Sequence, residues 1–382
     1  MSKKKILFQL NQLGFGGTEK AILSLAQALD RSEFDLYLFV QDQRASFRFL
    51  RHRFESFFSH RALRRFQTLY RDRYIRQPDF LRCFGVDRIH FGDLADFQKA
   101  IEEIQPDLIH LNRGEDQDFY TSFVPDLASK VKIVETNIFG RPSSSSYLQR
   151  VDRFLFVSQW LLQKSPWAQP KAEVLYNPIE EPLSKATLRA QLGIPTEAVV
   201  LGRVGRPDLG DDLFVQKVLE QVYSQVENNQ NPLYYLSLGI PAPTLPTGQQ
   251  QFQTQVKSLP ATTDALYLSS FYNSIDILLH RRVEGETFGM VNAEAMMHGK
   301  VVVSHLSKMD NAQVEVLGDS GFISDLNDTE AYSGYVTRLI QDPKLREEMG
   351  KKAAQRSFEL FRPKMVANRL QEIYRLLLDS HQ

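Results

Sequence analysis

Cysteine is almost missing from this sequence, and long apolar runs are missing altogether. Cys83 is the only cysteine, which excludes an internal disulfide, a cysteine-rich zinc site and a paired-thiol redox site. No apolar run approaches the roughly 20 residues of a membrane-spanning helix. Lys3, Lys4 and Lys5 lead into the first apolar stretch without a secretory cleavage pattern. We therefore expect a protein that faces the cytoplasm.

Net charge is lacking as well, because 46 Lys and Arg residues balance 46 Asp and Glu residues. The balance conceals a basic segment at residues 43–88, which holds twelve arginines and four acidic residues interleaved with aromatic and aliphatic side chains. This segment fits solvated helices packed on the protein, a surface for anionic lipid at the inner face of a membrane, or a site for an anionic polymer. No recognised nucleic-acid motif supports the last interpretation, so we expect no nucleic-acid partner.

What is present is an α/β pattern that is repeated. The 382 residues exceed one ordinary core. Short apolar runs alternate with helical periodicity from KILFQLN to AEVLYN, and again from AVVLGRVG through LYYLSLG, ALYLS, IDILLH and VVVSH to GFISDL. We predict two doubly wound domains at residues 1–180 and 181–362, with an insert at 43–88 and a helix at 363–382 that crosses back to the first domain.

One segment concentrates candidate chemistry, the stretch EGETFGMVNAEAMMHG from Glu284 to Gly299. The spacing predicts a strand that ends at His280, a polar loop, and a helix that Gly299 terminates. Glu286 then lies at the carboxyl end of a strand, where open α/β sheets bind ligands, and Glu294 lies within the helix. Taken alone, the two acids also fit a helix-start acid and a solvated helix residue.

This stretch resembles the motif of retaining glycosyltransferases of family 4, also called glycosyl transferases group 1. That motif has two glutamates separated by seven residues, with Phe-Gly after the first and Glu-Ala-Met at the second. The order and spacing of LGFGGTEKAILSLA, PDLIHLN, FLFVSQWL, VLYNPIE and VLGRVGRPD also resemble the family over nearly the whole chain. The resemblance implies a GT-B fold, in which two Rossmann-like domains face each other.

The resemblance also implies a binding site for a nucleotide sugar, as UDP- or GDP-linked donor. By it, Glu286 holds hydroxyls of the donor sugar and Glu294 holds the ribose. Backbone amides of Thr287, Phe288 and Gly289 meet the sugar or the diphosphate, which suits a helix N-terminus.

Further donor contacts are implied at two strand ends. Gly16 and Gly17, after Gly14, follow the first strand and permit close backbone approach to phosphates, although three glycines before a helix also fit an ordinary tight turn.

Arg203 and Arg206 stand where the family places an arginine against the diphosphate, and Arg206 is the preferred ligand. The family's lysine five residues later is missing, because Asp208 and Asp211 occupy the two possible positions.

Acceptor contacts are expected from His110, Asn112 and Arg113, which end the strand DLIHLN, and from Asn137. His110 equally fits a buried structural histidine. Many relatives have a histidine where this chain has Asn137, and an amide cannot take a proton. In the retaining mechanism inferred for the family, the leaving phosphate accepts the acceptor's proton on the same face of the sugar.

These features predict a glycosyltransferase with Glu286 and Arg206 as its catalytic residues, acting on a glycan, lipid-linked or small-molecule acceptor in cell-surface polysaccharide synthesis. Asp116 and Asp118 form an Asp-x-Asp triplet away from the donor motif, so we expect no catalytic metal and no cofactor beyond the nucleotide sugar. Gly239 and residues 266–270 are expected near the base. A non-catalytic sugar-nucleotide-binding or scaffold protein of the same fold is the main alternative, and a sugar-nucleotide epimerase is a weaker one.

Overall fold

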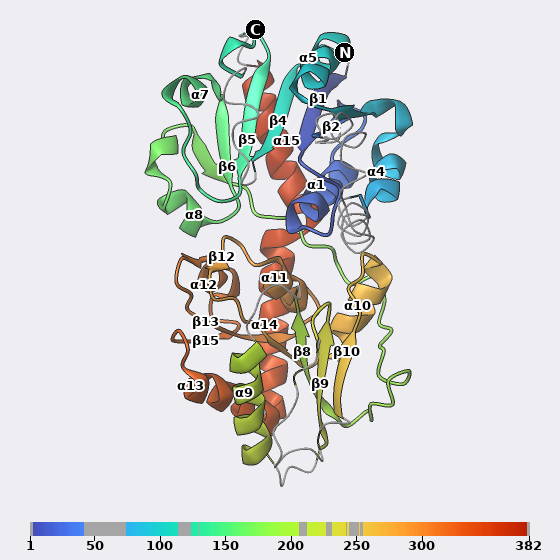
Figure 1. Ribbon diagram of the computed structural model, residues 1–382, viewed down its shortest axis with the longest axis vertical. Helices are drawn as coiled ribbons and strands as arrows, with labels where there is room; N and C mark the ends of the chain where they lie inside the picture. The colour runs from blue at the N-terminus through green and yellow to red at the C-terminus, as the bar shows by residue number, and fades with distance from the viewer. Residues whose placement is uncertain are drawn as a thin grey trace, which may run out of the picture. The chain divides into compact units, whose positions relative to one another are not determined.

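The chain forms two compact units of similar size. The computed structural model describes residues 3–41, 74–113, 124–128, 130–205, 212–226, 231–241, 243, 252 and 255–379. One unit consists of Met1–Pro178 together with Pro363–Gln382, and the other of Ile179–Arg362 (Figure 1). The chain passes from the first unit to the second after Pro178, two residues before the boundary drawn from the sequence. The last helix belongs to the first unit.

The first unit is built on a parallel sheet of seven strands in the order β3-β2-β1-β4-β5-β6-β7. Its strands are β1 (Lys4–Leu10), β2 (Phe34–Gln41), β3 (Ile89–Gly92), β4 (Leu108–Arg113), β5 (Lys132–Asn137), β6 (Arg153–Phe156) and β7 (Ala172–Val174). Ile6 and Phe8 of β1 have no exposed surface, and full burial of such a side chain stabilises a fold by about 1.5–3 kcal/mol. The continuous apolar run of β1 is typical of a parallel strand covered on both faces.

Helices cover this sheet, and the last helix of the chain is one of them. They are α1 (Gly17–Ala28), α4 (Gln77–Phe84), α5 (Leu94–Ile104), α7 (Ser145–Arg150), α8 (Gln159–Gln163) and α15 (Pro363–Asp379), with 3-10 turns η1 (Val86–Arg88), η2 (Val124–Asp126) and η3 (Pro166–Ala168). α15, red in Figure 1, packs beside α1, and its buried Leu370 and Tyr374 join the same apolar core as Phe8. The C-terminal helix therefore completes the first unit.

The second unit repeats the plan with a parallel sheet in the order β10-β9-β8-β11-β13-β15. These strands are β8 (Val199–Val204), β9 (Leu233–Leu238), β10 (Val256–Leu259), β11 (Ile277–Leu279), β13 (Val301–His305) and β15 (Phe322–Ser324). A separate two-stranded ladder joins β12 (Gly285–Glu286) to β14 (Asp310–Asn311). The helices are α9 (Asp212–Gln225), α10 (Ala265–Ser274), α11 (Met290–Met297), α12 (Ala312–Leu317), α13 (Thr329–Gln341) and α14 (Pro343–Phe361). The predicted pair of doubly wound Rossmann-like domains is confirmed.

One predicted strand is wrong, because ALYLS begins α10 instead. The Asp264 side chain accepts hydrogen bonds from the backbone N–H groups of Leu266 and Tyr267, and so caps this helix. The strand at that point of the fold is β10, whose sequence VKSL carries too weak an apolar signal to be recognised.

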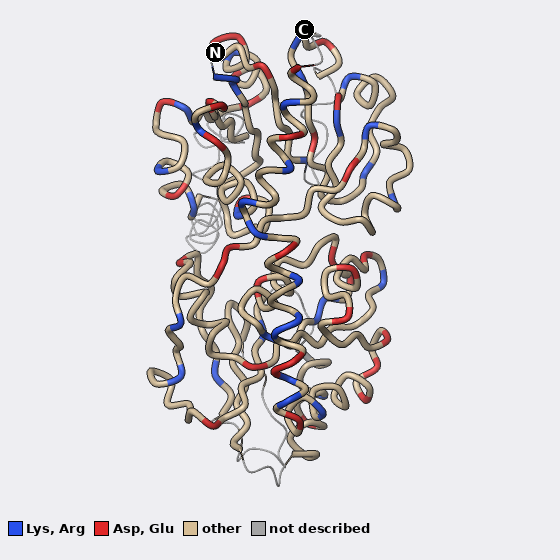
Figure 2. The backbone as a smooth tube through the Cα atoms, turned by 180° about the vertical axis from the view of Figure 1, so that it is seen from behind, with Lys and Arg blue, Asp and Glu red and all other residues tan. Residues whose placement is uncertain are grey.

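Charges of both signs are scattered over the described chain, as Figure 2 shows. The basic segment 43–88 lies outside the described residues up to position 73. In its described part, Arg82 pairs with Asp79 and Arg88 pairs with Asp35. Among the helices of the described residues, none is both long and apolar enough to cross a bilayer.

Candidate functional site

The acidic motif lies beside the carboxyl end of β11, the edge at which parallel α/β sheets bind ligands. Glu286 belongs to β12, which pairs with β14 in the register Gly285 to Asp310 and Glu286 to Asn311. Gly285 has a φ of +93°, and a Cβ there would lie 1.8 Å from the carbonyl oxygen of Asp310. Only glycine fits this position, and it fixes where Glu286 enters the site.

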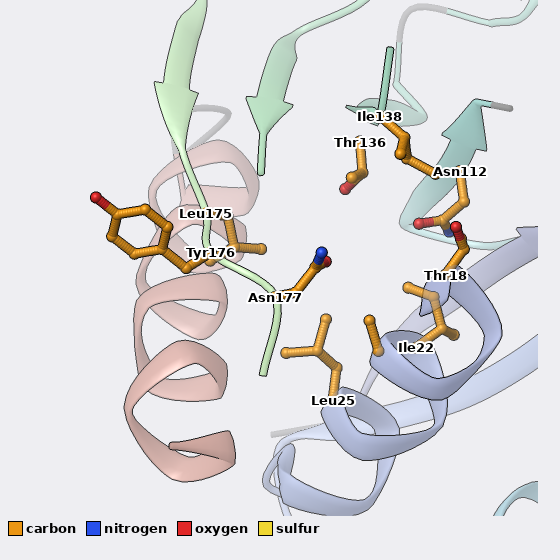
Figure 3. Close-up of a pocket in the computed structure, with 10 residues that line it drawn as sticks. Thr18, Ile22, Leu25, Asn112, Thr136, Ile138, Leu175, Tyr176 and Asn177 are labelled. Carbon is orange, nitrogen blue, oxygen red and sulfur yellow. The ribbon is translucent and has the colours of Figure 1, made fainter. Parts of the chain in front are cut away.

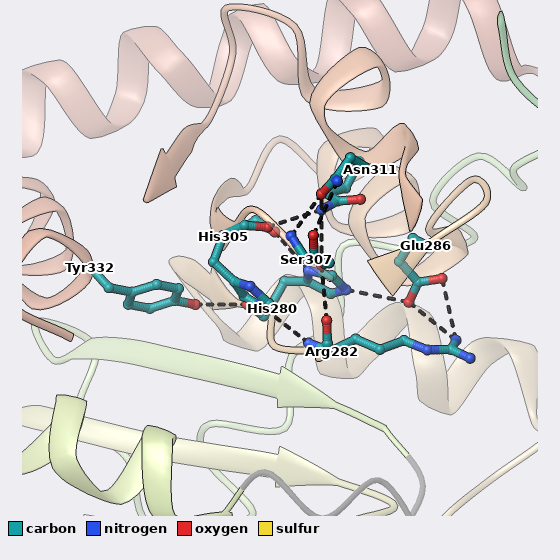
Figure 4. A network of polar contacts seen from close by, with 9 residues as sticks. His280, Arg282, Glu286, His305, Ser307, Asn311 and Tyr332 are labelled. Atoms are coloured by element: carbon teal, nitrogen blue, oxygen red, sulfur yellow. Dashed lines mark hydrogen bonds and ion pairs between the residues drawn. The ribbon is translucent and has the colours of Figure 1, made fainter. Parts of the chain in front are cut away.

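Two cationic or hydrogen-bonding side chains hold the carboxylate of Glu286 (Figure 4). His280 Nε2 lies 3.4 Å from Oε1, and Arg282 Nη1 lies 3.4 Å from Oε2. Burial raises the pKa of Glu286, but the hydrogen bond and charge of His280, followed by the charge of Arg282, outweigh burial and leave that pKa below its ordinary value. Because the side chain is still 18% exposed, Glu286 is an oriented anion that can accept hydrogen bonds from hydroxyl groups.

Behind Glu286, a buried network anchors both of its partners. His280 Nδ1 lies 2.8 Å from Ser304 Oγ, so the ring bridges β13 and the carboxylate. His305 Nε2 accepts a hydrogen bond from the backbone N–H of Arg282 at 3.0 Å. Burial lowers the pKa of His305 to about 3, which agrees with a neutral ring that accepts a hydrogen bond at Nε2.

The loop that faces this network is fixed from within. The backbone N–H of Ser307 donates to Asn311 Oδ1 at 2.7 Å, and Ser307 Oγ donates to the carbonyl oxygen of Arg282 at 3.0 Å. Figure 4 shows Ser307 between its two partners, Asn311 and the backbone of Arg282. The site is therefore shaped by hydrogen bonds to backbone as well as by side-chain pairs.

The segment Thr287–Gly289 leads directly into α11. Phe288 is buried and meets the ring of Phe361 edge-on at 5.2 Å. Gly289 has a φ of +92° and is the N-cap residue of α11, and it provides no side-chain hydrogen bond to the helix. The first N–H groups of α11 thus begin at a residue without a side chain, an arrangement that favours binding of an anion.

Glu294 lies on α11, and its contacts were not foreseen from the sequence. The carboxylate is nearly buried, at 7% exposure, and its Oε2 accepts a hydrogen bond from the Tyr272 hydroxyl at 2.7 Å. The alternative of a solvated helix residue is therefore wrong, because the carboxylate is nearly buried and bonded by a neighbouring helix. Gly299 has a φ of +70° just after α11, as expected of a helix terminator.

Of the two arginines expected to bind phosphate, the structure describes only Arg203. Arg203 lies in β8 and is 5% exposed, so its guanidinium lies within the second unit. Arg206 lies outside the described residues, and so do Asp208 and Asp211, the positions of the missing lysine.

The glycine loop of the first unit has an internal role. Gly16 is the N-cap residue of α1, and a Cβ there would lie 2.2 Å from a carboxylate oxygen of the buried Glu19. Gly17 begins the helix and is exposed. The close backbone approach that the sequence suggested at Gly16 is at least partly an approach to this chain's own Glu19.

The strand end at His110 shows a buried histidine. His110 has no exposed surface, and its ring nitrogens contact the Tyr374 hydroxyl at 2.5 Å and Thr136 Oγ1 at 2.7 Å. Burial lowers its pKa to about 3. Of the two interpretations of His110, the geometry supports the structural one and not a direct contact with an acceptor.

Arg113 and Asn137 are likewise engaged inside the first unit. Arg113 Nη1 lies 3.6 Å from the fully buried Glu135, and Nη2 donates to the carbonyl oxygen of Pro142 at 3.1 Å. Asn137 donates to Glu135 Oε1 and to the carbonyl oxygen of Arg141, both at 2.8 Å, and accepts from the Arg141 N–H at 3.1 Å. Both side chains stabilise the loop after β5, so neither is displayed for an acceptor in the way that we expected.

Asn112 differs from these three residues because it lines a small pocket (Figure 3). The described lining residues are Thr18, Ala21, Ile22, Leu25, Asn112, Thr136, Ile138, Leu175, Tyr176 and Asn177. Asn112 Nδ2 donates to the carbonyl oxygen of Gln9 at 3.0 Å, while its buried Oδ1 has no hydrogen-bond partner within the described part of the chain. Asn112 therefore remains a candidate for contact with a bound molecule.

Metal binding finds no support in the part of the chain that can be described. No group of three or more His, Cys, Asp or Glu residues there is arranged to hold a metal ion. Asp116 and Asp118 lie outside that part.

Comparison with known proteins gives a family match for part of the second unit. Residues 235–356, which contain Tyr272, Glu286 and Glu294, match the family model of Glycosyl transferases group 1. The chain is 28% identical over 126 residues to N-acetyl-alpha-D-glucosaminyl L-malate synthase of Bacillus anthracis, a match that covers 31% of this chain and 32% of that protein. The match with this curated relative thus spans about a third of its length.

Solved structures resemble the whole chain. A glycosyltransferase from Rickettsia africae ESF-5 has a TM-score of 0.69 at 14% identity, over 99% of both chains. Anabaena Alr3699/HepE, solved in complex with UDP-glucose, has a TM-score of 0.63 at 18% identity, over 97% of this chain and 99% of that one. Sucrose-phosphate synthase from Thermosynechococcus elongatus has a TM-score of 0.63 at 15% identity, over 99% and 100%. The chain therefore has the GT-B fold of two Rossmann-like domains, and its second unit contains a segment that matches the family model of Glycosyl transferases group 1.

Proposed function

We propose that this protein is a glycosyltransferase that moves a sugar from a nucleoside diphosphate sugar to an acceptor with retention of anomeric configuration. The observation that supports this most strongly is the setting of Glu286. It is an oriented carboxylate beside the N-terminus of α11, and it lies inside the segment that matches Glycosyl transferases group 1. A carboxylate for sugar hydroxyls next to amides for phosphate is the arrangement that such a donor needs.

The donor site follows from this arrangement. Glu286 holds the sugar, the amides of Thr287 to Gly289 meet the diphosphate, and Glu294 receives the ribose. Arg203 and Arg206 neutralise the departing phosphate, as cationic groups do where charge develops. UDP and GDP are the proposed carriers, and the HepE structure with UDP-glucose favours testing UDP first.

The acceptor is the less defined substrate. We place it on the first unit near Asn112, and its class is a glycan, a lipid-linked glycan or a small molecule. Asn137 is held by Glu135 and Arg141 and cannot take a proton. The proposal therefore assigns the acceptor's proton to the leaving phosphate, as a retaining reaction on one face of the sugar allows. An anionic membrane remains the proposed partner of the segment 43–88.

The exchange of Glu286 for alanine tests this function. In assays with UDP- and GDP-sugars and a panel of glycan and lipid acceptors, Glu286→Ala should reduce transfer by at least about a hundredfold. Glu284→Ala removes an exposed carboxylate two residues away and should leave the rate unchanged. Wild-type transfer by Glu286→Ala would refute the assignment.

A non-catalytic sugar-nucleotide-binding protein is the second candidate. The tightly bound amide of Asn137, in the place of a usual histidine, is the observation that favours it. Titration calorimetry with UDP- and GDP-sugars, followed by an assay of donor hydrolysis, separates the candidates. Binding without turnover would support this second function.

A further inference from the structure

A buried tyrosine of the second unit has no place in the donor site as proposed so far. Tyr272 lies on α10 and is 1% exposed. Its hydroxyl donates a hydrogen bond of 2.7 Å to Oε2 of Glu294, 22 residues later on α11. A hydroxyl that bonds a carboxylate at this distance fixes both the side-chain rotamer and the direction of the carboxylate.

A second contact ties the same two helices together. The imidazole of His298 packs on the Tyr272 ring with centroids 5.1 Å apart. Its Nδ1 donates to the backbone carbonyl oxygen of Glu294 at 2.9 Å, and its Nε2 lies 3.0 Å from Ser269 Oγ. Glu294 is thus held through its side chain by Tyr272 and through its backbone by His298.

We propose that Tyr272 is a positioning residue, whose hydroxyl holds the Glu294 carboxylate in the direction needed to receive the ribose hydroxyls of a nucleoside diphosphate. This inference rests on the proposed function, in which Glu294 binds the ribose. A glutamate on a helix otherwise samples several rotamers, and binding would have to select one of them. Fixing the rotamer beforehand removes that loss of conformational freedom from the binding step.

The protonation of Tyr272 agrees with this role. Burial, followed by the neighbouring charge of Glu294, raises the pKa of Tyr272 well above its ordinary value. The phenol therefore keeps its proton and donates to the carboxylate throughout the physiological pH range. Oε2 of Glu294 therefore keeps the hydrogen bond from Tyr272 over this range.

The competing explanation is that the bond only joins α10 to α11. If the bond is purely structural, its loss should weaken the binding of every nucleotide by the same factor, or should leave the binding of every nucleotide unchanged. A positioning bond acts through the ribose alone, so the ligand's 2′ and 3′ hydroxyls distinguish the two explanations.

The test compares UDP with 2′,3′-dideoxy-UDP by titration calorimetry on the chain of 382 residues, with GDP and its dideoxy analogue in parallel. Tyr272→Phe removes only the hydroxyl, and we expect UDP or GDP to bind about tenfold more weakly, a loss typical of one hydrogen bond to a charged group. The dideoxy nucleotide should bind wild type and variant alike, which also shows that the variant is folded.

Two matched variants sharpen the result. Tyr223→Phe alters another buried tyrosine of the second unit, whose hydroxyl contacts the carbonyl oxygen of Leu233 at 3.5 Å, and should leave every affinity unchanged. In a Glu294→Ala background, Tyr272→Phe should cause no further loss for UDP, because its effect passes through the missing carboxylate.

Two results would overturn the inference. They are unchanged UDP and GDP affinity in Tyr272→Phe, and an equal loss for the ribose and dideoxy nucleotides. A wild-type protein that binds neither UDP nor GDP would instead remove the proposed function, and the role of Tyr272 with it. A variant without effect in a protein that does bind removes only the role of Tyr272.

Discussion

Each of the two units carries a glutamate near the carboxyl edge of its parallel sheet, Glu135 within β5 of the first unit and Glu286 in β12, which follows β11 in the second. Glu135 has no exposed surface and is surrounded by Arg113, Asn137 and Tyr147. Glu286 is 18% exposed, and its cationic partner Arg282 is 34% exposed. The same residue type at equivalent edges thus has a closed set of partners in one unit and a partly open set in the other.

Exposure and bonding partners together distinguish structural from functional polar groups at such edges. The first sheet uses its charged and amide side chains to stabilise the loop after β5, so a ligand there has to use the remaining groups, such as Asn112. In the second unit, His280 supports the carboxylate of Glu286 from behind, and part of that carboxylate stays exposed. Partial exposure combined with a well-anchored orientation is the feature expected of a binding group.

Removal of each carboxylate should give the largest difference in stability between the two units. Glu135→Ala takes the buried partner from Arg113 and should lower the free energy of unfolding by about 3–5 kcal/mol. Glu286→Ala leaves Arg282, which water can solvate, and should lower it by less than about 1 kcal/mol. Urea unfolding of both variants measures the difference, and equal losses would show that the two edges are built alike.

Two glycines with nearly the same φ test how tightly each unit is packed around its loops. Gly85 in the first unit has a φ of +91°, and a Cβ added there would have no heavy atom within 4 Å, whereas a Cβ on Gly285 at +93° would meet the Asp310 carbonyl oxygen at 1.8 Å. Gly85→Ala should lose about 1–3 kcal/mol through backbone strain alone. Gly285→Ala should lose about 1–3 kcal/mol more, because the backbone must shift. Thermal unfolding compares them, and a smaller loss in Gly285→Ala would contradict the crowding.

Both units contain a buried histidine whose pKa is about 3, and the dependence of stability on pH tests this shared feature. His110 belongs to the first sheet and His305 to the second. In the unfolded chain a histidine has a pKa of about 6.5, so between about pH 6.5 and pH 3 the unfolded state binds more protons. Stability should therefore fall on acidification across this window, by up to about 1.4 kcal/mol per pH unit for each histidine.

Replacement of either histidine checks this expectation. His110→Gln and His305→Gln should each flatten the pH dependence of the unfolding free energy between pH 6.5 and pH 4, measured by urea titration at several pH values. A flatter curve in only one variant would show that the two edges bury their histidines differently. Unchanged curves in both would contradict the assigned protonation states.

Much of the fold could be predicted from the sequence, because its signals are local. Apolar runs such as KILFQLN predict buried parallel strands, and Pro363 divides the last two helices as expected. The failure at ALYLS is also local in origin, since a short apolar run fits a strand or a helix and the Asp264 cap decided the outcome. Glu294 was placed correctly on a helix because the motif is contiguous, whereas Glu286, predicted in a loop, lies in the short strand β12, which pairs with the distant β14.

Patterns along the chain were enough to predict the two doubly wound domains and to select the segment Glu284 to Gly299 for donor chemistry. Which polar groups are bonded within the fold became visible only in three dimensions. His110 is closed off by Tyr374, 264 positions away, and Glu294 is directed by Tyr272 on another helix. The physical reason is that burial and hydrogen bonding depend on neighbours brought together by packing, and no pattern along the chain records those neighbours.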